Sequence, residues 1–180
     1  MKKIELVTER LLLRGVEPED QKMIFSGLSD PEVTEFYGVN FQTYEATAEQ
    51  MKYYSDNEMA GTGKFWVVCE KNNGAVAGVG GVYNISHEHR KGEVGFWLFK
   101  NYWGKGYLQE GMNAIVDFSF KVLNLHRIEG VVETTNIRCK KAIENAGFLY
   151  EGTLKDAEIK NGKFISLCYY AIINPSESES

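Results

Sequence analysis

One stretch of the chain, residues 93–134, restricts the possible folds more than any other. A strand-like apolar run at 93–99 passes through the turn Gly104-Lys105-Gly106 into residues 108–121, where apolar side chains recur at helical spacing. A second strand-like run, residues 127–134, follows that helix. Two strands joined by a helix usually lie parallel in one sheet, because the helix returns the chain to the end from which it started. The stretch therefore predicts an α/β fold with one parallel strand pair.

Hairpins and further helices are expected on both sides of this stretch. Asn161-Gly162, between two strand-like runs, is a strong signal for a tight hairpin turn. Asn136 has the position of a helix N-cap, and Gly147 has the position typical of the residue after a helix C-terminus. The expected strands span residues 4–13, 65–69, 76–83, 93–99, 127–134, 150–159 and 164–173, and the expected helices begin at Pro18 or span residues 47–54, 108–121 and 137–145.

Size and composition indicate one globular domain. The chain has 180 residues, of which 43% are hydrophobic and 25% charged, enough for a single core. We expect the domain to span residues 1–174 and the last six residues, P-S-E-S-E-S at 175–180, to form a flexible polar tail. A net charge of −5 argues against the basic surface that duplex DNA requires, so direct DNA binding is not expected.

Cysteine and histidine usage argues against a metal site. The three cysteines lack a C-x-x-C spacing, which excludes a zinc motif of that kind and favours a reducing compartment. His87 and His89 lie among charged residues typical of a solvated loop, so no metal is expected there. The sequence shows neither a signal peptide nor an apolar run of the roughly 18 residues that a membrane span needs. We expect a cytoplasmic protein that does not contact a membrane.

The turn Gly104-Lys105-Gly106 is the first candidate binding site. Glycines let backbone N–H groups approach an anion closely, and the helix after them adds partial positive charge at its N-terminus. The turn is neither a Walker loop nor a dinucleotide fingerprint, because it lacks the remaining residues of both motifs. Two interpretations remain open: an anion cradle, or a tight turn without a ligand.

Six motifs of the chain resemble, in order and spacing, those of the GCN5-related N-acetyltransferase (GNAT) superfamily, and most closely its RimJ/RimL-type branch of ribosomal-protein N-terminal acetyltransferases. They are T-E-R-L-L-L-R from Thr8, Y-W-G-K-G-Y from Tyr102, L-N-L-H-R-I-E from Leu123, N-x-x-C from Asn136, G-F-x-x-E-G from Gly147 and A-E-x-x-N-G from Ala157. The resemblance extends over residues 5–173. It implies a single GNAT-like domain whose mixed central sheet, flanked by helices, contains a parallel strand pair that splays near Phe99 and Thr134.

The same resemblance implies acetyl-coenzyme A (acetyl-CoA) as co-substrate, without a metal. The strand backbone at Trp97, Leu98 and Phe99 would hold the pantetheine arm. The turn would bind the pyrophosphate through Trp103, Gly104, Lys105, Gly106, Tyr107 and Leu108. Asn136 would contact a pantetheine amide, a role that is compatible with its N-cap position.

The implied chemistry needs a neutral amine and a proton donor for the departing thiolate. By resemblance, Glu158 is the candidate base, and Cys139 is the candidate donor to the coenzyme A sulfur because Ile143 occupies the place of the usual tyrosine acid. Both residues could instead be structural, Glu158 as a solvent-facing strand residue and Cys139 as an inert helix cysteine. A covalent acetyl-cysteine route is the competing mechanism, and direct attack in a ternary complex is favoured because Cys139 has no evident histidine partner.

The acceptor is expected to be a cationic amine. Residues 17–60 carry ten acidic and two basic side chains, a net charge of −8, and in the resembled family this region forms the acceptor side of the cleft. Such a run could also be a solvated helical face. A protein or peptide N-terminus is the first choice, because an α-amino group with a pKa of about 7.7 to 8 needs only a modest base. A polyamine or aminoglycoside acceptor, a non-catalytic acyl-CoA sensor and a homodimer remain open alternatives.

Overall fold

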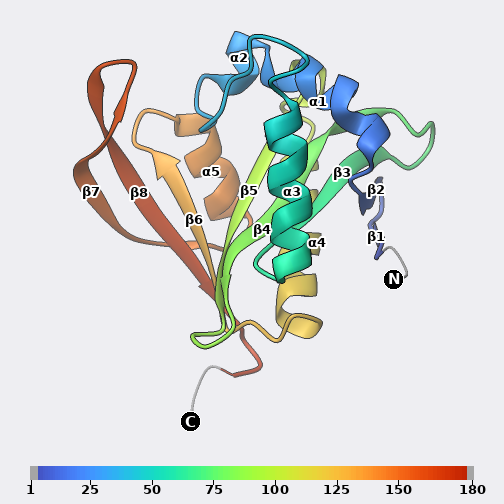
Figure 1. Cartoon of the computed structure of the whole chain (residues 1–180). Helices are drawn as coiled ribbons and strands as arrows, with labels where there is room; N and C mark the ends of the chain where they lie inside the picture. Colours follow the sequence, from blue (N-terminus) through green and yellow to red (C-terminus); the bar gives the residue numbers. More distant parts are fainter. Residues whose placement is uncertain (1–3, 178–180) are drawn as a thin grey trace.

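The computed structural model describes residues 4–177 and contains one eight-stranded sheet in the order β1-β2-β3-β4-β5-β6-β8-β7 (Figure 1). The strands are β1 (Leu6–Val7), β2 (Leu11–Gly15), β3 (Lys64–Glu70), β4 (Val76–Ser86), β5 (Lys91–Leu98), β6 (Arg127–Glu133), β7 (Leu149–Lys160) and β8 (Lys163–Ile173). The helices are α1 (Gln21–Leu28), α2 (Pro31–Thr34), α3 (Ala48–Ala60), α4 (Tyr107–Lys121) and α5 (Ile137–Asn145), with short 3-10 turns η1 (Pro18–Asp20) and η2 (Lys100–Tyr102).

The parallel strand pair is confirmed, and it is short. Strands β5 and β6 pair in parallel at three positions only, ending at Glu93 opposite Glu129. Beyond that point β5 continues to Leu98 and β6 to Glu133 without pairing with each other, so the two strands part. The separation begins earlier than the predicted place near Phe99 and Thr134. All other neighbouring strands in the sheet are antiparallel, which makes the sheet mixed, as expected.

Helices cover both faces of the sheet and create two buried clusters. On one face, α4 and α5 contribute residues such as Ile115 and Ile143 to a cluster that includes Trp66, whose ring packs edge-on against Phe118 at a centroid distance of 5.1 Å. On the other face, α1, α2 and α3 pack over a second cluster that contains Trp97. Adjacent positions of β5, Trp97 and Leu98, therefore face opposite layers, as alternation along a strand requires.

The N-terminal segment differs from its prediction. The alternating residues at 4–13 were expected to form one strand, but the described part folds into the β1–β2 hairpin. The amide of Thr8 donates to the carbonyl of Leu11, and the Leu11 amide donates to the Thr8 hydroxyl, so the chain reverses at residues 8–11. The polar residues between the two apolar pairs are a turn, a distinction that period-2 spacing alone does not make.

The helices before β3 are also more extensive than predicted. Helix α3 continues past the expected end near Tyr54 and stops at Gly61, whose φ of +70° provides the left-handed C-terminal position. The four-residue helix α2 was not predicted; Asp30 caps it by accepting a hydrogen bond from the Glu32 amide. Within residues 4–177 no helix is both long and apolar enough to cross a membrane.

The described part of the predicted tail contacts the domain. Glu177 accepts a hydrogen bond from Arg90 at 2.7 Å and lies 3.2 Å from His126. Residues 178–180 lie outside the described range.

His87, the first histidine of the H-x-H pair, lies 2.8 Å from the Gly61 carbonyl, and no group of three potential metal ligands occurs among the described residues.

Strands β4 and β5 approach each other very closely at Gly78. A Cβ atom at this position would lie 2.1 Å from the carbonyl oxygen of Trp97 and 2.8 Å from the Cα of Leu98. Backbone atoms cannot move aside as the end of a side chain can, so Gly78→Ala must displace β5. We expect Gly78→Ala to lower the free energy of unfolding by about 1–3 kcal/mol in urea denaturation.

Gly15→Ala is the matched control for this substitution. Gly15 also lies in a strand, but a Cβ there would meet nothing within 4 Å. Equal stability of the Gly78→Ala and Gly15→Ala variants would contradict the close approach of β4 and β5.

Candidate functional site

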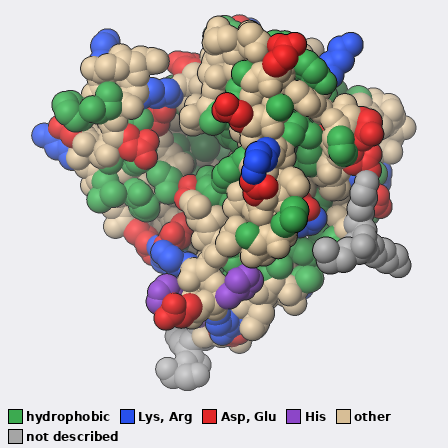
Figure 2. All heavy atoms as spheres, viewed as in Figure 1, with side chains coloured by type: hydrophobic (Ala, Val, Ile, Leu, Met, Phe, Trp, Pro, Cys, Tyr) green, Lys and Arg blue, Asp and Glu red, His purple; other side chains and the backbone are tan. Residues whose placement is uncertain are grey.

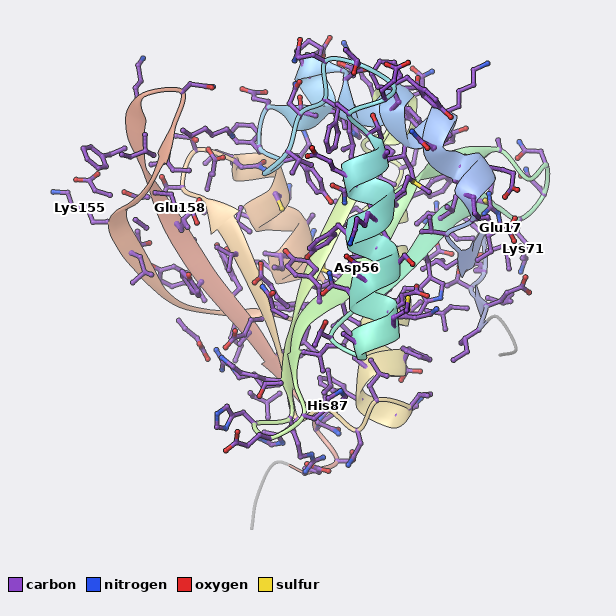
Figure 3. The ribbon with its side chains drawn as sticks, viewed as in Figure 1. Glu17, Asp56, Lys71, His87, Lys155 and Glu158 are labelled. Atoms are coloured by element: carbon purple, nitrogen blue, oxygen red, sulfur yellow. The ribbon has the colours of Figure 1, made fainter. Side chains whose placement is uncertain are left out.

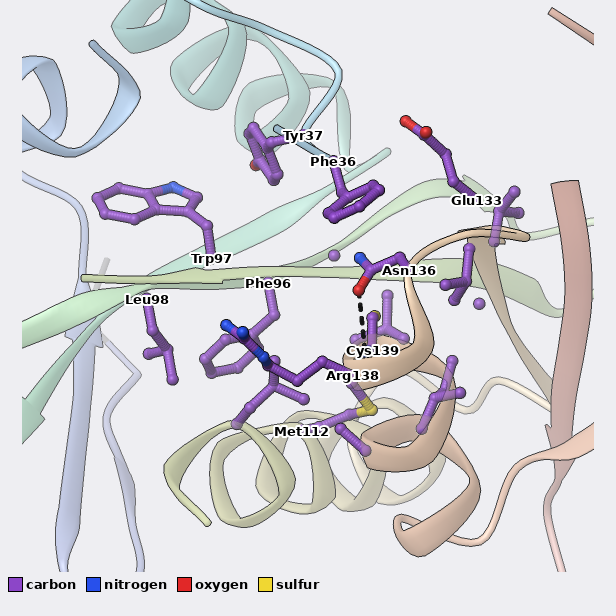
Figure 4. A pocket seen from close by; sticks show the side chains of 18 of the residues that line it. Phe36, Tyr37, Phe96, Trp97, Leu98, Met112, Glu133, Asn136, Arg138 and Cys139 are labelled. Atoms are coloured by element: carbon purple, nitrogen blue, oxygen red, sulfur yellow. Dashed lines mark hydrogen bonds between the residues drawn. The ribbon is translucent and has the colours of Figure 1, made fainter. Parts of the chain in front are cut away.

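A cleft of about 1320 Å³ opens where β5 and β6 part, and it is lined from both sides of the sheet (Figure 4). The loop before α4, the first turns of α4 and the length of α5 line one side. The segment after α2, α3 and the β7–β8 hairpin line the other. In Figure 2 the surface is hollowed between this hairpin and the helices. Because β5 lacks a strand partner on this edge after Glu93, the backbone of its last five residues borders the cleft.

The predicted anion cradle has the expected backbone geometry. Gly104 and Gly106 have φ values of +74° and +78°, a region that other residues rarely adopt. The backbone N–H groups from Gly104 to Gln109 donate to no other residue of the described chain. Helix α4 begins at Tyr107, so these free donors lie at the positive end of a 15-residue helix. The arrangement can bind a phosphate or another anion.

The side chains of this loop do not all face the cleft. The Lys105 ammonium lies 5.0 Å from the ring centre of Tyr102 and does not line the cleft, and Phe99 does not line it either. Trp103 donates from its indole nitrogen to the Leu98 carbonyl at 2.9 Å. The Arg138 guanidinium stacks 4.5 Å from the centre of the Trp103 ring, and both residues line the cleft. The remaining residues predicted to bind the cofactor all line it: Trp97, Leu98, Gly104, Gly106, Tyr107, Leu108 and Asn136.

Asn136 caps a helix and leaves its side-chain nitrogen free. Its side-chain oxygen accepts a hydrogen bond from the Cys139 amide at 3.0 Å, which caps α5 (Figure 4). The cap uses only the oxygen. The amide nitrogen donates to no described residue and remains available to a ligand in the cleft.

Cys139 lies on the first turn of α5 and lines the cleft. Burial raises the pKa of its thiol to about 11. At neutral pH the group is therefore an S–H donor, with roughly one molecule in 10⁴ as thiolate. This environment is suited to donating a hydrogen bond and unsuited to nucleophilic attack.

Glu158 lies on β7, immediately after an irregularity in its pairing with β8, and reaches the cleft from the hairpin side (Figure 3). Its carboxylate has no ion-pair or hydrogen-bond partner among residues 4–177. The cleft therefore unites Glu158, Cys139, Asn136 and most of the loop, although these residues are spread over some 60 positions of the sequence.

Glu93 is a cleft residue that the sequence analysis missed. It occupies the last position at which β5 pairs with β6 and accepts hydrogen bonds from the Tyr83 hydroxyl at 2.8 Å and the Asn84 amide at 3.2 Å. Burial, reinforced by the negative charge of Glu93, raises the pKa of Tyr83 far above its usual value, so the tyrosine stays a neutral donor. A single charged residue at the start of an apolar strand was the available signal.

The acidic character of the cleft has a different origin from the one predicted. Of the ten acidic residues in 17–60, only Glu32 and Glu35 line the cleft, and Glu32 pairs with Lys100 at 2.6 Å. The other cleft carboxylates come from later segments: Glu93, Glu133 and Glu158. Glu133 is paired with Lys160, whereas Glu93 and Glu158 make no ion pair with a described basic residue.

Aromatic residues line the cleft on the α1–α3 side. They come from the segment after α2 and from α3, β3, β4 and β5: Phe36, Tyr37, Tyr53, Tyr54, Phe65, Tyr83 and Trp97. The Tyr54 hydroxyl and the Trp97 indole nitrogen are buried without a hydrogen-bond partner in the described structure, and burial raises the pKa of Tyr54 to about 12. An aromatic wall with unpaired carboxylates favours a cationic ligand.

Comparison with known proteins identifies a family and close structural likenesses. Residues 10–149 match the family model described as an acetyltransferase (GNAT) domain. The uncharacterized N-acetyltransferase p20 of Bacillus licheniformis is 32% identical over 169 residues, which cover 93% of this chain and 95% of p20.

Two solved structures share the fold. Spermidine N-acetyltransferase from Vibrio cholerae, in complex with CoA and spermine, has a TM-score of 0.82 at 23% identity and covers 92% of this chain and 96% of its own. Ribosomal-protein-S5-alanine acetyltransferase from Vibrio fischeri has a TM-score of 0.84 at 23% identity, with 96% and 97% covered.

The raised pKa of Cys139 predicts its reactivity. Alkylation needs the thiolate, so the labelling rate of Cys139 should rise about tenfold per pH unit up to pH 10 and reach half of its plateau only near pH 11. The rate can be followed by mass spectrometry of the peptide that contains Cys139, at pH values where the fold is shown to be intact by circular dichroism. A rate that reaches its plateau near pH 8 would contradict the buried, protonated thiol.

Proposed function

The chain belongs to the GNAT acetyltransferase family, and from this membership we propose that it transfers the acetyl group of acetyl-CoA directly to the N-terminus of a peptide or protein. The protein is an acetyl-CoA-dependent N-acetyltransferase. The acceptor and the roles of individual residues are our proposal. The observation that carries it is one cleft with free N–H donors at one end and unpaired carboxylates at the other, joined through the gap between β5 and β6.

The donor side of the cleft fits coenzyme A. We assign the diphosphate to the free N–H groups of the loop at residues 104–108, where the positive end of α4 favours an anion. The pantetheine arm would lie along the open edge of β5 at Trp97 and Leu98, with the free amide nitrogen of Asn136 near one of its carbonyls. Bound acetyl-CoA supplies the thioester that the amine attacks.

The residues at the centre of the cleft suit a direct transfer. The amine must lose a proton, and Glu158 is the proposed base, acting directly or through a water. Glu93 is the alternative base, because it too lines the cleft and has no ion-pair partner among the described residues. Cys139 retains its proton at neutral pH and would donate it in a hydrogen bond to the departing sulfur, which also disfavours an acetyl-cysteine intermediate.

The acceptor is proposed to be an α-amine for energetic reasons. An α-amino group is roughly a tenth neutral at pH 7, whereas an amine near pKa 10.4 costs about 3 kcal/mol more to deprotonate. A polyamine is the second candidate, because Glu93 and Glu158 leave the acceptor side negatively charged and one structural neighbour is a spermidine acetyltransferase. At 23% identity, the similarity to that neighbour shows a shared fold and not a shared acceptor.

A panel of acceptors tests the proposal. Initial rates would be measured with acetyl-CoA and Ser- or Ala-starting peptides, spermidine and an aminoglycoside. The proposal expects the highest kcat/KM with a peptide. A higher value with spermidine would show that the acceptor is a polyamine and not a peptide N-terminus. Tight coenzyme A binding without turnover on any amine would instead support a sensor.

The loop backbone, rather than the Lys105 charge, should determine coenzyme A affinity. Gly106→Val forces a β-branched residue into φ +78° and places a Cβ 3.3 Å from the Arg10 guanidinium, so we expect the coenzyme A Kd to rise about 10-fold or more. Lys105→Ala should change it less than threefold, because that side chain does not line the cleft. Isothermal titration of both variants decides the matter; a larger loss in Lys105→Ala would contradict the assignment.

Substitutions of Glu158, Glu93 and Cys139 test which residue acts as the base and whether Cys139 acts as the hydrogen-bond donor. We expect Glu158→Gln to lower kcat/KM by about 10² while the coenzyme A Kd hardly changes. Cys139→Ser should keep most activity because a hydroxyl can donate, whereas Cys139→Ala should lose at least about 10-fold. If Glu93→Gln is inactive and Glu158→Gln is active, Glu93 is the base. Full activity in Cys139→Ala would rule out the proposed donor.

A further inference from the structure

Arg10, in the turn between β1 and β2, contacts the loop before α4 through several groups at once. Its Nη1 donates to the Lys105 carbonyl at 2.8 Å, and its Nε donates to the Glu110 carboxylate at 2.7 Å. The guanidinium also stacks 4.8 Å from the centre of the Tyr107 ring. Arg10 does not line the cleft, so it reaches the loop from behind.

Glu110 makes this contact rigid. Its carboxylate accepts hydrogen bonds from the Thr8 hydroxyl at 2.6 Å and the Arg10 amide at 2.8 Å, in addition to the Arg10 side chain. Burial alone would raise the pKa of Glu110, but the hydrogen bonds from Thr8 and Arg10 hold it below its usual value. The acid therefore stays ionised and keeps the arginine in one orientation at neutral pH.

The hydrogen bond to the Lys105 carbonyl determines where the next N–H group points. The peptide between Lys105 and Gly106 is planar and trans, so its C=O and N–H point in opposite directions. The carbonyl faces Arg10 behind the loop. The Gly106 N–H must then point away from Arg10, toward the cleft that Gly106 lines.

Without this contact the peptide could turn over. Gly106 has no side chain to restrict its φ, and Lys105 makes no contact from within the cleft that would hold the plane. A flipped peptide would present a carbonyl oxygen where the cradle needs an N–H donor. The partial negative charge of that oxygen would repel a bound anion.

We propose that Arg10 is a positioning residue for the cofactor: it holds the Lys105–Gly106 peptide in the one orientation that directs an N–H group to the diphosphate of coenzyme A. The inference rests on the proposed binding of that diphosphate at the loop. It gives the Thr8–Arg10 motif a function at a site 95 residues further along the chain.

Coenzyme A affinity in Arg10 variants tests this proposal. We expect the Kd for coenzyme A to rise about 10-fold or more in Arg10→Ala, the range expected when a buried or charge-assisted hydrogen bond is lost. Arg10→Lys should recover part of that loss, since one ammonium can reach the carbonyl or the carboxylate but cannot form the whole set. Arg90→Ala is the matched control: it removes the same charge from an arginine that pairs with Glu177 outside the cleft.

Three ligands distinguish a positioned diphosphate site from a direct phosphate contact and from a general structural effect. Dephospho-coenzyme A keeps the diphosphate and should lose the same factor as coenzyme A. Pantetheine lacks the diphosphate, so its Kd should be equal in the wild type and Arg10→Ala. Melting temperatures should change little, because the Arg10 side chain is 45% exposed and ion pairs near the surface contribute little to stability.

Each pattern of Kd values has one meaning. A coenzyme A Kd in Arg10→Ala within twofold of that in Arg90→Ala would overturn the proposal. A loss confined to coenzyme A would make Arg10 a direct ligand of the 3′-phosphate, and an equal loss for pantetheine would make its effect generally structural; both would overturn it too. If the wild type itself does not bind coenzyme A, the proposed function fails instead.

Discussion

The end of the pairing between β5 and β6 is the constraint on which the rest of this structure depends. Three paired positions fix the two strands in parallel, and after Glu93 and Glu129 they part. The separation leaves one edge of β5 without a partner and opens a passage through the sheet. Strand β5 keeps its place because it stays paired with β4 on its other edge as far as Leu98. Helix α4, which joins the two strands, therefore begins beside the opening.

The two ends of this passage differ in the charge of the ligand that they favour. Free N–H groups at the start of α4 favour an anion, and the unpaired Glu93 and Glu158 favour a cation. Cys139, which burial keeps protonated, lines the same cleft. These three environments suit an anionic cofactor, a departing thiolate and an amine.

The sequence predicted what depends on short segments. The strand, glycine turn and helix around Gly106 are local, so spacing alone predicted the parallel pair and marked the turn as a candidate anion cradle. Contacts between residues distant in the sequence could not be predicted in this way. Arg10 and Glu110, for example, are 100 residues apart, and no local pattern links them. The same limit explains the acidic cleft, because charge density in residues 17–60 does not reveal which carboxylates face inward. Glu93 was missed because a charged residue at the start of an apolar run can equally be a solvent-facing strand end.

A crystal structure of the complex with coenzyme A would test the central claim most directly. We predict the diphosphate within hydrogen-bond distance of the N–H groups at residues 104–108. We further predict the pantetheine arm between the parted ends of β5 and β6, and the sulfur near Cys139. A diphosphate bound elsewhere on the molecule, or an arm that does not enter between β5 and β6, would contradict this claim.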